Sequence, residues 1–292
     1  MTRGSCLCGT VRWEAEAPFT RMRHCHCSMC RKAHGAPFAT YISVARERYR
    51  LVAGATDITG YQSSAQYHRA FCSICGSVAP SMENDGNVDM PAGCLDDDPG
   101  IRPTMHIFTG SKAAWDTIAD SLPRAEAYEA GNTTLPVPQQ HAHRPDSFDA
   151  LRGSCLCSAV AYEITAPFRV SYHCHCHRCQ KARAAAHTTN GSVARDAFHY
   201  VRGEELVVHY RVPDAITFTH SFCRICGSGM VRPGGDRPFV TVPLASLDDD
   251  PVIRPFNRIY MNYVAPWFTI EDDLPQFGEG PDKRPIAYFQ DA

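Results

Sequence analysis

Short cysteine spacings that occur twice are the feature of this sequence best suited to chemistry. Each half of the chain carries seven cysteines in three groups, C-x-C, then C-x-C-x-x-C, then C-x-x-C. In the first half these are Cys6 and Cys8, then Cys25, Cys27 and Cys30, then Cys72 and Cys75. In the second half they are Cys155 and Cys157, then Cys174, Cys176 and Cys179, then Cys223 and Cys226. Clustered thiols of this kind are typical zinc ligands, so the pattern predicts two zinc sites in each half and up to four zinc ions per chain.

The outer pairs predict a closed structural site with four thiolates. Its ligands are Cys6, Cys8, Cys72 and Cys75 in the first half and Cys155, Cys157, Cys223 and Cys226 in the second. Gly76 and Gly227 follow the C-x-x-C pairs, where a tight turn favours glycine. A redox-active C-x-x-C pair is the alternative, but the matching C-x-C pair in a distant segment favours zinc.

The middle group predicts a site of a different kind. Cys25, Cys27 and Cys30 lie within six residues, as do Cys174, Cys176 and Cys179, so one loop can place three thiolates on one metal. Three protein ligands leave a fourth position for substrate, as in catalytic zinc sites. The alternative is that a histidine closes the site; the candidates are His24, His26 and His34 in the first half and His173, His175 and His177 in the second.

An open three-thiolate site favours sulfur chemistry. Three thiolates give a zinc centre a net charge of about −1, which makes it a weaker Lewis acid than a tris-histidine site. Soft ligands favour a soft fourth partner, and zinc strongly lowers the pKa of a thiol that binds it. We therefore expect a small-molecule thiol bound as thiolate, with the six cysteines of the two middle groups as the catalytic candidates.

The elements that position these cysteines are also duplicated. Segments 4–8 and 24–33 return 149 positions later, the C-x-x-C group returns 151 positions later, and the run 95–99 returns 152 positions later. Self-similarity of this extent indicates a tandem repeat of one domain. A polar, proline-containing stretch separates the copies, and it predicts a first domain at 1–138, a linker at 139–148 and a second domain at 149–292.

Apolar residues within each copy mostly alternate with a period of two. Val11, Trp13 and Ala15 alternate with charged residues, and the equivalent segment 160–164 of the second copy does the same. Further strands are expected at 38–44, 106–108, 206–210, 215–219 and 239–244. Because no segment predicts a long, capped helix, the fold class is mainly β.

Composition excludes several classes of function. The net charge is −2 and no basic stripe is present, so we expect no nucleic-acid partner. No apolar run approaches the roughly eighteen residues needed to span a bilayer, so we expect no membrane segment. The first residues lack the apolar core of a secretory signal, and clustered thiols suit a reducing compartment; we expect a cytoplasmic protein.

The joint cysteine spacing and its flanking residues resemble a known family. Segments 25–38, 71–77, 95–99 and 106–108, with Ser111, Lys112 and Trp115, are similar to the glutathione-dependent formaldehyde-activating enzymes and the centromere protein V group, over nearly all of both copies. The resemblance implies two zinc-binding β-tent domains, each with a structural S4 zinc and a three-cysteine zinc to which the thiolate of glutathione binds. It also implies a carbon–sulfur lyase activity, in which formaldehyde and the co-substrate glutathione condense to S-hydroxymethylglutathione.

The second copy departs from the family pattern outside its cysteines. Gly35–Phe38 becomes Ala184–His187, His106 becomes Arg258, and Ser111-Lys112 becomes Tyr263-Val264. All seven cysteines remain, so both copies are expected to bind metal, whereas ligand binding is expected to be altered or lost in the second.

The same residues allow two alternative functions. A non-catalytic pair of zinc-binding interaction domains is one alternative; a relative of the methionine sulfoxide reductases is another, and it requires Cys94 as a reactive thiol. We expect Cys94 to be a small buried residue and Trp115 and Trp267 to pack in a core or interface.

Because duplicated chains often reproduce a two-fold dimer internally, we expect a monomer whose repeats form a pseudo-dimer on a shared apolar surface.

Overall fold

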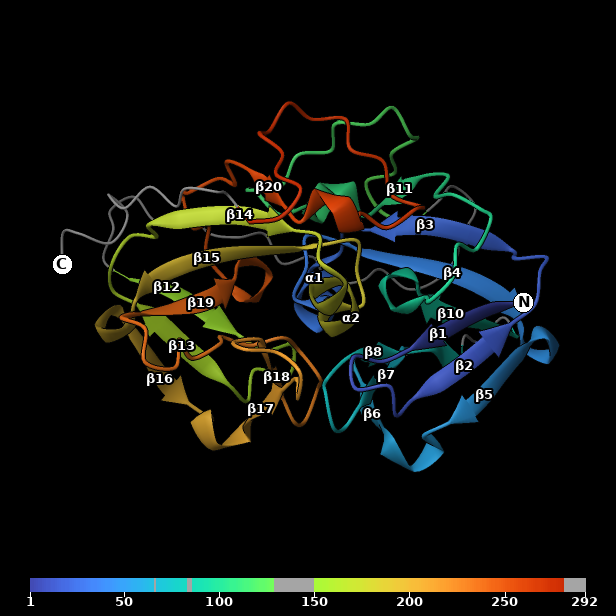
Figure 1. Cartoon of the computed structure of the whole chain (residues 1–292), viewed down its shortest axis with the longest axis horizontal. Coiled ribbons are helices and arrows are strands. Elements are labelled where there is room, and N and C mark those ends of the chain that lie inside the picture. The colour runs from blue at the N-terminus through green and yellow to red at the C-terminus, as the bar shows by residue number, and fades with distance from the viewer. Residues whose placement is uncertain (66, 83–85, 129–149, 281–292) are drawn as a thin grey trace.

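The computed structural model describes residues 1–65, 67–82, 86–128 and 150–280. The predicted linker at 139–148 lies outside these residues, and the predicted domain boundaries remain predictions. Figure 1 shows the two repeats beside each other, with the two short helices in the middle of the molecule.

Both repeats are built mainly from short strands. The first repeat contains β1 Thr2–Ser5, β2 Arg12–Ala15, β3 Arg21–Cys25, α1 Ser28–His34, β4 Ala39–Ala45, β5 Tyr49–Ala53, β6 Ile58–Gln62, β7 His68–Cys72, β8 Val78–Ala79, β9 Ser81–Met82, β10 Asn87–Pro91 and β11 His106–Ile107. The second contains β12 Leu151–Ser154, β13 Ala161–Ile164, β14 Val170–Cys174, α2 His177–Arg183, β15 Thr188–Ala194, β16 Phe198–Arg202, β17 Val207–Arg211, β18 Thr219–Cys223, β19 Phe239–Pro243 and β20 Arg258–Ile259. The mainly β class predicted from the sequence is confirmed.

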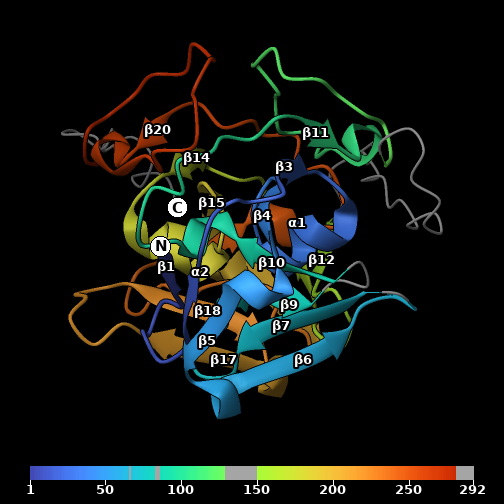
Figure 2. The same ribbon diagram turned by 90° about the vertical axis from the view of Figure 1, so that its right-hand side faces the viewer.

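The repeats share one strand order, except that β8 and β9 of the first repeat have no counterpart among the named strands of the second. In the first repeat the sheets have the orders β1-β2-β5, β11-β3-β4-β10-β9 and β6-β7-β8; in the second they have the orders β12-β13-β16, β19-β15-β14-β20 and β17-β18. Figure 2 looks at the first repeat, with β6 and β7 in front and β11 above. The strand that ends at the first cysteine of the middle group, β3 or β14, is antiparallel to the next strand and parallel to β11 or β20.

Most predicted strands are present, and one is not. Trp13 and Ala15 of β2 are buried while their neighbours are not, as the period of two predicts. The strand predicted at 215–219 is wrong: only Thr219 lies in β18. Residues 212–218 form the turn between β17 and β18, where the Ala215 N–H donates to the Val212 carbonyl. This turn holds the two residues by which the repeat offset grows from 149 to 151.

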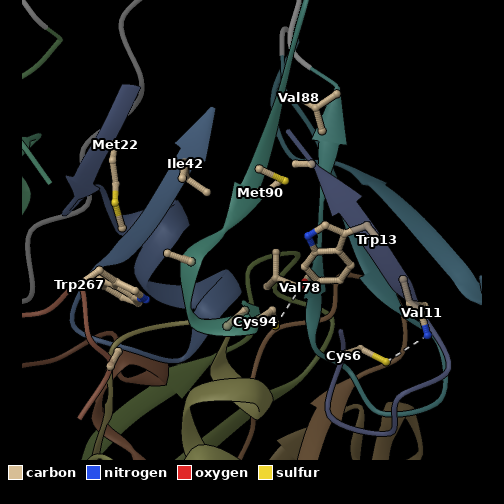
Figure 3. Packing of buried hydrophobic residues seen from close by; sticks show 14 of the residues in the cluster. Cys6, Val11, Trp13, Met22, Ile42, Val78, Val88, Met90, Cys94 and Trp267 are labelled. Atoms are coloured by element: carbon tan, nitrogen blue, oxygen red, sulfur yellow. Dashed lines mark hydrogen bonds between the residues drawn. The ribbon is translucent and has the colours of Figure 1, made fainter. Parts of the chain in front are cut away.

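Each repeat contributes one tryptophan to the hydrophobic core of the other repeat. Trp267 of the second repeat packs in the core of the first repeat, together with Trp13, Met22 and Met90 (Figure 3). Trp115 of the first repeat packs in the core of the second. Burial of one such side chain contributes about 5 kcal/mol at about 25 cal/mol per Å². Each repeat therefore needs the other for a complete core, and the expected packing role of both tryptophans is confirmed.

Two lysines, the buried Lys32 and the half-buried Lys181, connect the repeats reciprocally. Lys32 of α1 donates from Nζ to the Ser154 carbonyl at 2.7 Å and to Asp248 Oδ1 at 2.6 Å. Lys181 of α2 donates from Nζ to the Ser5 carbonyl at 2.9 Å in the mirrored contact. The repeats thus pack as an internal pseudo-dimer, and the monomeric state in solution remains a prediction. No helix in the described part of the chain is long and apolar enough to cross a bilayer.

Candidate metal centres

The outer cysteine pairs of each repeat meet as predicted. Cys6 and Cys8 lie in the turn between β1 and β2, Cys72 ends β7 and Cys75 follows it, and their four sulfurs all lie within 4.8 Å of one another. The Sγ–Sγ distances are 3.3 Å for Cys6–Cys8 and 3.7 Å for Cys8–Cys72. Zinc–sulfur bonds of about 2.3 Å give a tetrahedron with edges of about 3.8 Å. The donor set and its spacing therefore fit a zinc ion, and Cys155, Cys157, Cys223 and Cys226 form the same cluster in the second repeat.

Backbone conformation and close packing both favour glycine after each C-x-x-C pair. Gly76 and Gly227 have φ values of 74° and 72°, the left-handed region that favours glycine. A Cβ at Gly76 would lie 2.4 Å from the Phe222 ring, and a Cβ at Gly227 would lie 2.6 Å from the Phe71 ring. The turns that hold these cysteine pairs are thus also part of the contact between the repeats.

The middle cysteines form two compact three-sulfur clusters. β3 delivers Cys25, and Cys27 caps α1 by accepting a hydrogen bond from the Cys30 N–H at 3.3 Å. The sulfurs of Cys25, Cys27 and Cys30 lie within 4.8 Å of one another, and all three residues are buried. Cys174, Cys176 and Cys179 repeat the arrangement at the start of α2.

The histidines that were considered as a fourth ligand have other partners. His24 Nδ1 lies 2.7 Å from Thr40 Oγ1, His26 Nε2 lies 2.8 Å from His106 Nδ1, and His34 Nε2 lies 2.8 Å from the Tyr41 hydroxyl. In the second repeat His173 and His175 contact Thr189 and Arg258, and His177 is exposed against Tyr263. Among the described residues, no histidine belongs to either three-sulfur cluster, so the fourth position has no protein ligand there.

A buried arginine lies beside the three-sulfur cluster of the first repeat. Arg69 on β7 places Nη2 3.5 Å from Cys30 Sγ, and its Nε donates to Ser63 Oγ at 3.2 Å. Hydrogen bonds from Cys25 and Cys27, together with this guanidinium, hold the pKa of the Cys30 thiol well below its usual value. This arginine would offset the net negative charge of three thiolates on one zinc ion.

The second repeat also has a buried arginine, but a different element supplies it: α2 in place of the strand equivalent to β7. His220 is the equivalent of Arg69, and Arg183 on α2 is the equivalent of His34. Arg183 Nη1 lies 3.1 Å from His220 Nε2, and no carboxylate in the described part of the chain pairs with it. Burial and Arg232 lower the pKa of Arg183 to about 9, whereas Cys179 acts to raise it. Arginine and histidine have therefore exchanged positions while the site keeps its positive charge.

A hydrogen-bonded chain orients the histidine between Cys25 and Cys27. His106 Nε2 lies 2.9 Å from the Asp120 carboxylate, which assigns the proton of that ring to Nε2. His106 Nδ1 then accepts from His26 Nε2, and His26 Nδ1 carries a lone pair that faces Asp116 Oδ2 at 4.0 Å. In the second repeat Arg258 replaces His106, donates to Asp272 and lies 3.0 Å from His175 Nε2.

Sequence reasoning placed all fourteen predicted ligands in the four clusters but missed their surroundings. Arg69, Asp116, Asp120 and Arg183 were not considered. Comparison of the two copies would have found Asp120, because Asp-x-Leu-Pro occurs at 120–123 and again at 272–275. It would also have shown a basic residue three positions before the C-x-x-C pair in both copies.

Of three comparisons with known proteins, one identifies a family for both repeats. No match is found among curated proteins. A crystal structure of a Rhodobacter sphaeroides protein is 28% identical over 35% of this chain and 97% of its own, with a TM-score of 0.30. The family described as "Glutathione-dependent formaldehyde-activating enzyme" matches residues 1–111 and 150–263, which are the two repeats in turn. The chain is therefore a tandem duplication within the glutathione-dependent formaldehyde-activating enzyme family, and it belongs to that family.

Proposed function

We propose that this chain is a zinc-dependent carbon–sulfur lyase-like enzyme that acts on the glutathione adduct of a small aldehyde such as formaldehyde. The observation that carries the proposal is the cluster of Cys25, Cys27 and Cys30. Three buried thiols lie within 4.8 Å of one another, with no fourth side-chain ligand among the described residues. Membership of the family supports glutathione as the thiol and formaldehyde as the aldehyde.

Each group near this cluster has a proposed part. Cys25, Cys27 and Cys30 would hold the zinc ion, which when bound supplies a Lewis-acidic position that favours a thiolate over a thiol. Arg69 compensates the negative charge of the thiolates. Phe108 packs against the cluster and is covered by Tyr128 at a ring distance of 4.6 Å, which keeps water away from the sulfurs on that side.

The proposed reaction needs only the thiol and the aldehyde. The sulfur lone pair attacks the aldehyde carbon, a carbon–sulfur bond forms, and the carbonyl electrons move to the oxygen. That oxygen takes up the proton released by the thiol, so the product is the hydroxymethyl thioether. Exclusion of water from the sulfur raises the effective nucleophilicity of the thiolate.

We assign the activity to the first repeat. It keeps Gly35–Phe38, His106, Ser111 and Lys112 of the family pattern, and the second repeat does not. The cluster of Cys174, Cys176 and Cys179 is proposed to bind metal and, because of Arg183, a thiol of different preference.

The reductase alternative is disfavoured by the state of its cysteine. Cys94 has no exposed surface, and burial raises the pKa of its thiol to about 12. A reactive cysteine requires access and thiolate character. We also propose a cytoplasmic location, because fifteen unbridged cysteines suit a reducing compartment.

The test compares thiol binding and turnover in matched variants. Zinc-loaded chain should bind glutathione by calorimetry and should accelerate formation of S-hydroxymethylglutathione, followed by NMR, above the uncatalysed rate. Cys25→Ser should abolish both at the first repeat, whereas Cys94→Ser should change neither. Equal glutathione binding by Cys25→Ser and the parent protein would overturn the proposal.

A further inference from the structure

A small cavity lies beside the three-sulfur cluster of the second repeat. Cys179 of that cluster lines it, together with Arg183 on α2, Asn190 on β15 and Arg232, which lies between β18 and β19. The cavity volume is about 10 Å³, which is room for one water-sized molecule or ion. None of the described residues that line it is an aspartate or a glutamate. The cavity is therefore very small, and its charged side chains other than the cysteine are positive.

Arg183 brings a buried positive charge that no carboxylate of the described residues neutralises. It is 4% exposed, and its Nη1 lies 3.1 Å from His220 Nε2. His220 Nδ1 lies 2.7 Å from the Cys75 carbonyl, to which it donates, so Nε2 is the lone-pair nitrogen that accepts from Arg183. The neutral imidazole thus satisfies one N–H of the guanidinium and leaves its charge unpaired.

Arg232 and Asn190 add further donors to the cavity. Arg232 is half-buried, its guanidinium carbon lies 5.5 Å from the centre of the Phe218 ring, and the described residues give it no carboxylate partner. Asn190 Oδ1 accepts a hydrogen bond from the Thr188 hydroxyl at 3.4 Å, which leaves the amide N–H groups of Asn190 as donors. Two guanidinium groups and one amide line the cavity, and this is a donor set that binds anions.

The first repeat is more negative at the equivalent positions. Arg232 forms a β-bridge with Thr241, and in the first repeat Ser81 pairs with Asp89 in the same way. An arginine therefore stands in place of a serine, and a threonine in place of a buried aspartate. The position of Asn190 is occupied in the first repeat by the larger Tyr41. The second repeat thus has one positive charge more, one negative charge fewer and a smaller side chain at this place.

The charges of the two sites balance differently. Three thiolates and one zinc ion carry a net charge of about −1. In the first repeat Arg69 offsets this charge, and Asp89 has its own partner in Arg21 at 3.5 Å. In the second repeat both Arg183 and Arg232 face the same net charge, which leaves one positive charge in excess. An uncompensated buried charge is costly, and one monoanion in the cavity would remove the excess.

We propose that this cavity binds one small inorganic monoanion, of the size of chloride or hydrosulfide, beside the metal centre of the second repeat. Arg183, Arg232 and Asn190 donate to the anion, and the small volume excludes larger ligands. The inference goes beyond the proposed function, which concerns the centre of the first repeat, and gives the second repeat a ligand of its own.

The position of the anion is tested in crystals of the zinc-loaded full chain grown with sodium bromide. One anomalous-scattering peak should lie in this cavity, and none should lie beside Tyr41 in the first repeat. Arg232→Ser introduces the residue that the first repeat has, Thr241→Asp introduces its carboxylate, and each should remove the peak. The control is Arg237→Ser, because Arg237 is an exposed arginine of the same turn that lies 5.7 Å from the Phe239 ring centre and outside the cavity; it should leave the peak unchanged.

The strength and identity of the anion are tested in solution by the line width of the chlorine NMR signal. Arg232→Ser and Thr241→Asp should weaken chloride binding at least about tenfold, at unchanged zinc content and melting temperature. Hydrosulfide that displaces chloride at a lower concentration than bromide does identifies hydrosulfide as the preferred ligand, and equal displacement identifies a halide site. Glutathione is too large for the cavity and should not compete.

The inference is overturned by a cavity without bromide or by bromide peaks of equal height in the two repeats. Chloride binding that Arg232→Ser leaves unchanged, or that glutathione displaces, also overturns it. All of these measurements report on anion binding at the second repeat and not on turnover at the first. Failure of the inference and failure of the proposed function are therefore distinguishable.

Discussion

Replacing Arg69 with methionine should loosen the metal held by Cys25, Cys27 and Cys30 and leave the other three clusters unchanged. Methionine keeps much of the volume of the buried side chain but removes its charge. The Nη2 atom of Arg69 lies 3.5 Å from Cys30 Sγ, so its charge contacts this cluster directly, and the buried Arg31 interacts electrostatically with Cys27 and Cys30 as well.

The size of the effect follows from that distance. A unit charge at 3.5 Å from a thiolate contributes about 5 kcal/mol at an effective dielectric constant of about 20. Desolvation of the buried guanidinium offsets part of this, and hydrogen bonds to charged groups are worth about 1.5–3 kcal/mol net. Zinc affinity at this cluster should therefore fall about 10- to 100-fold, which is also the usual cost of losing a partner just outside the ligands.

Chelator titration followed by cysteine alkylation measures this directly. As chelator increases, mass spectrometry of the alkylated peptides identifies which cluster has lost its metal. Arg69→Met should expose the Cys25–Cys30 peptide at about 10- to 100-fold less chelator than the parent, and Arg69→Lys should have a smaller effect. Arg183→Met should do the same for the Cys174–Cys179 peptide only. The reasoning is refuted if Arg69→Met protects its cluster as well as the parent, or if Arg69→Lys is as harmful as Arg69→Met.

Metal analysis should find about four zinc ions per chain, and a value near two, with the middle cysteines free, would contradict the four clusters. Cys72→Ser should lower the melting temperature by roughly 10 °C or more, because metal binding at a closed site is folding free energy; Cys25→Ser should cost less, and equal losses would argue against the division into structural and open sites. Burial raises the pKa of Asp116 to about 7, with Lys112, Arg258 and Arg31 acting in the opposite direction. The folded state keeps a proton that the unfolded state releases at its ordinary pKa of about 4, so stability is lost as pH rises from about 4 to about 7 and is constant above that. Asp116→Asn should therefore gain stability relative to the parent across this window, by at most about 1.4 kcal/mol per pH unit, and a difference independent of pH in thermal unfolding would exclude this. Light scattering should give a mass near 32.3 kDa, and twice that value would contradict an internal pseudo-dimer.

The ligands were predictable because their information is local. Two or three thiols within six residues must lie close together whatever the fold, and the repeat showed which groups belong together. The strands with strict alternation, such as β2, were predictable for the same reason. The error at 215–219 came from apolar and β-branched residues in a turn, where Pro213 and Asp214 decide the backbone and side-chain type does not.

The surroundings of the open site were not predictable, because they depend on distant contacts. Arg69 is 39 residues from Cys30 and reaches it only because β7 and α1 lie on neighbouring parts of the fold. Lys32 belongs to the resemblance, yet its partners Ser154 and Asp248 lie in the other repeat, where no spacing rule places them. The repeat predicted that two domains would pack together, but it did not predict that they would exchange tryptophans.

The contact between Phe38 and His187 has a consequence for how such a protein changes over time. These two residues occupy equivalent positions of the two repeats, and their rings meet at 5.7 Å across the pseudo-two-fold axis. In a homodimer of identical chains, two copies of one residue would meet at this position of the interface. A single substitution would then change both copies, and the interface would have to accept the new residue on both sides.

Covalent duplication removes that restriction. A phenylalanine can face a histidine, and His106–Asp120 on one side of the axis can coexist with Arg258–Asp272 on the other. Each half can then accept changes that a symmetric pair would reject, while the opposite half continues to supply its tryptophan and its lysine. One metal centre is thereby free to acquire a new ligand preference without loss of the fold that both centres share.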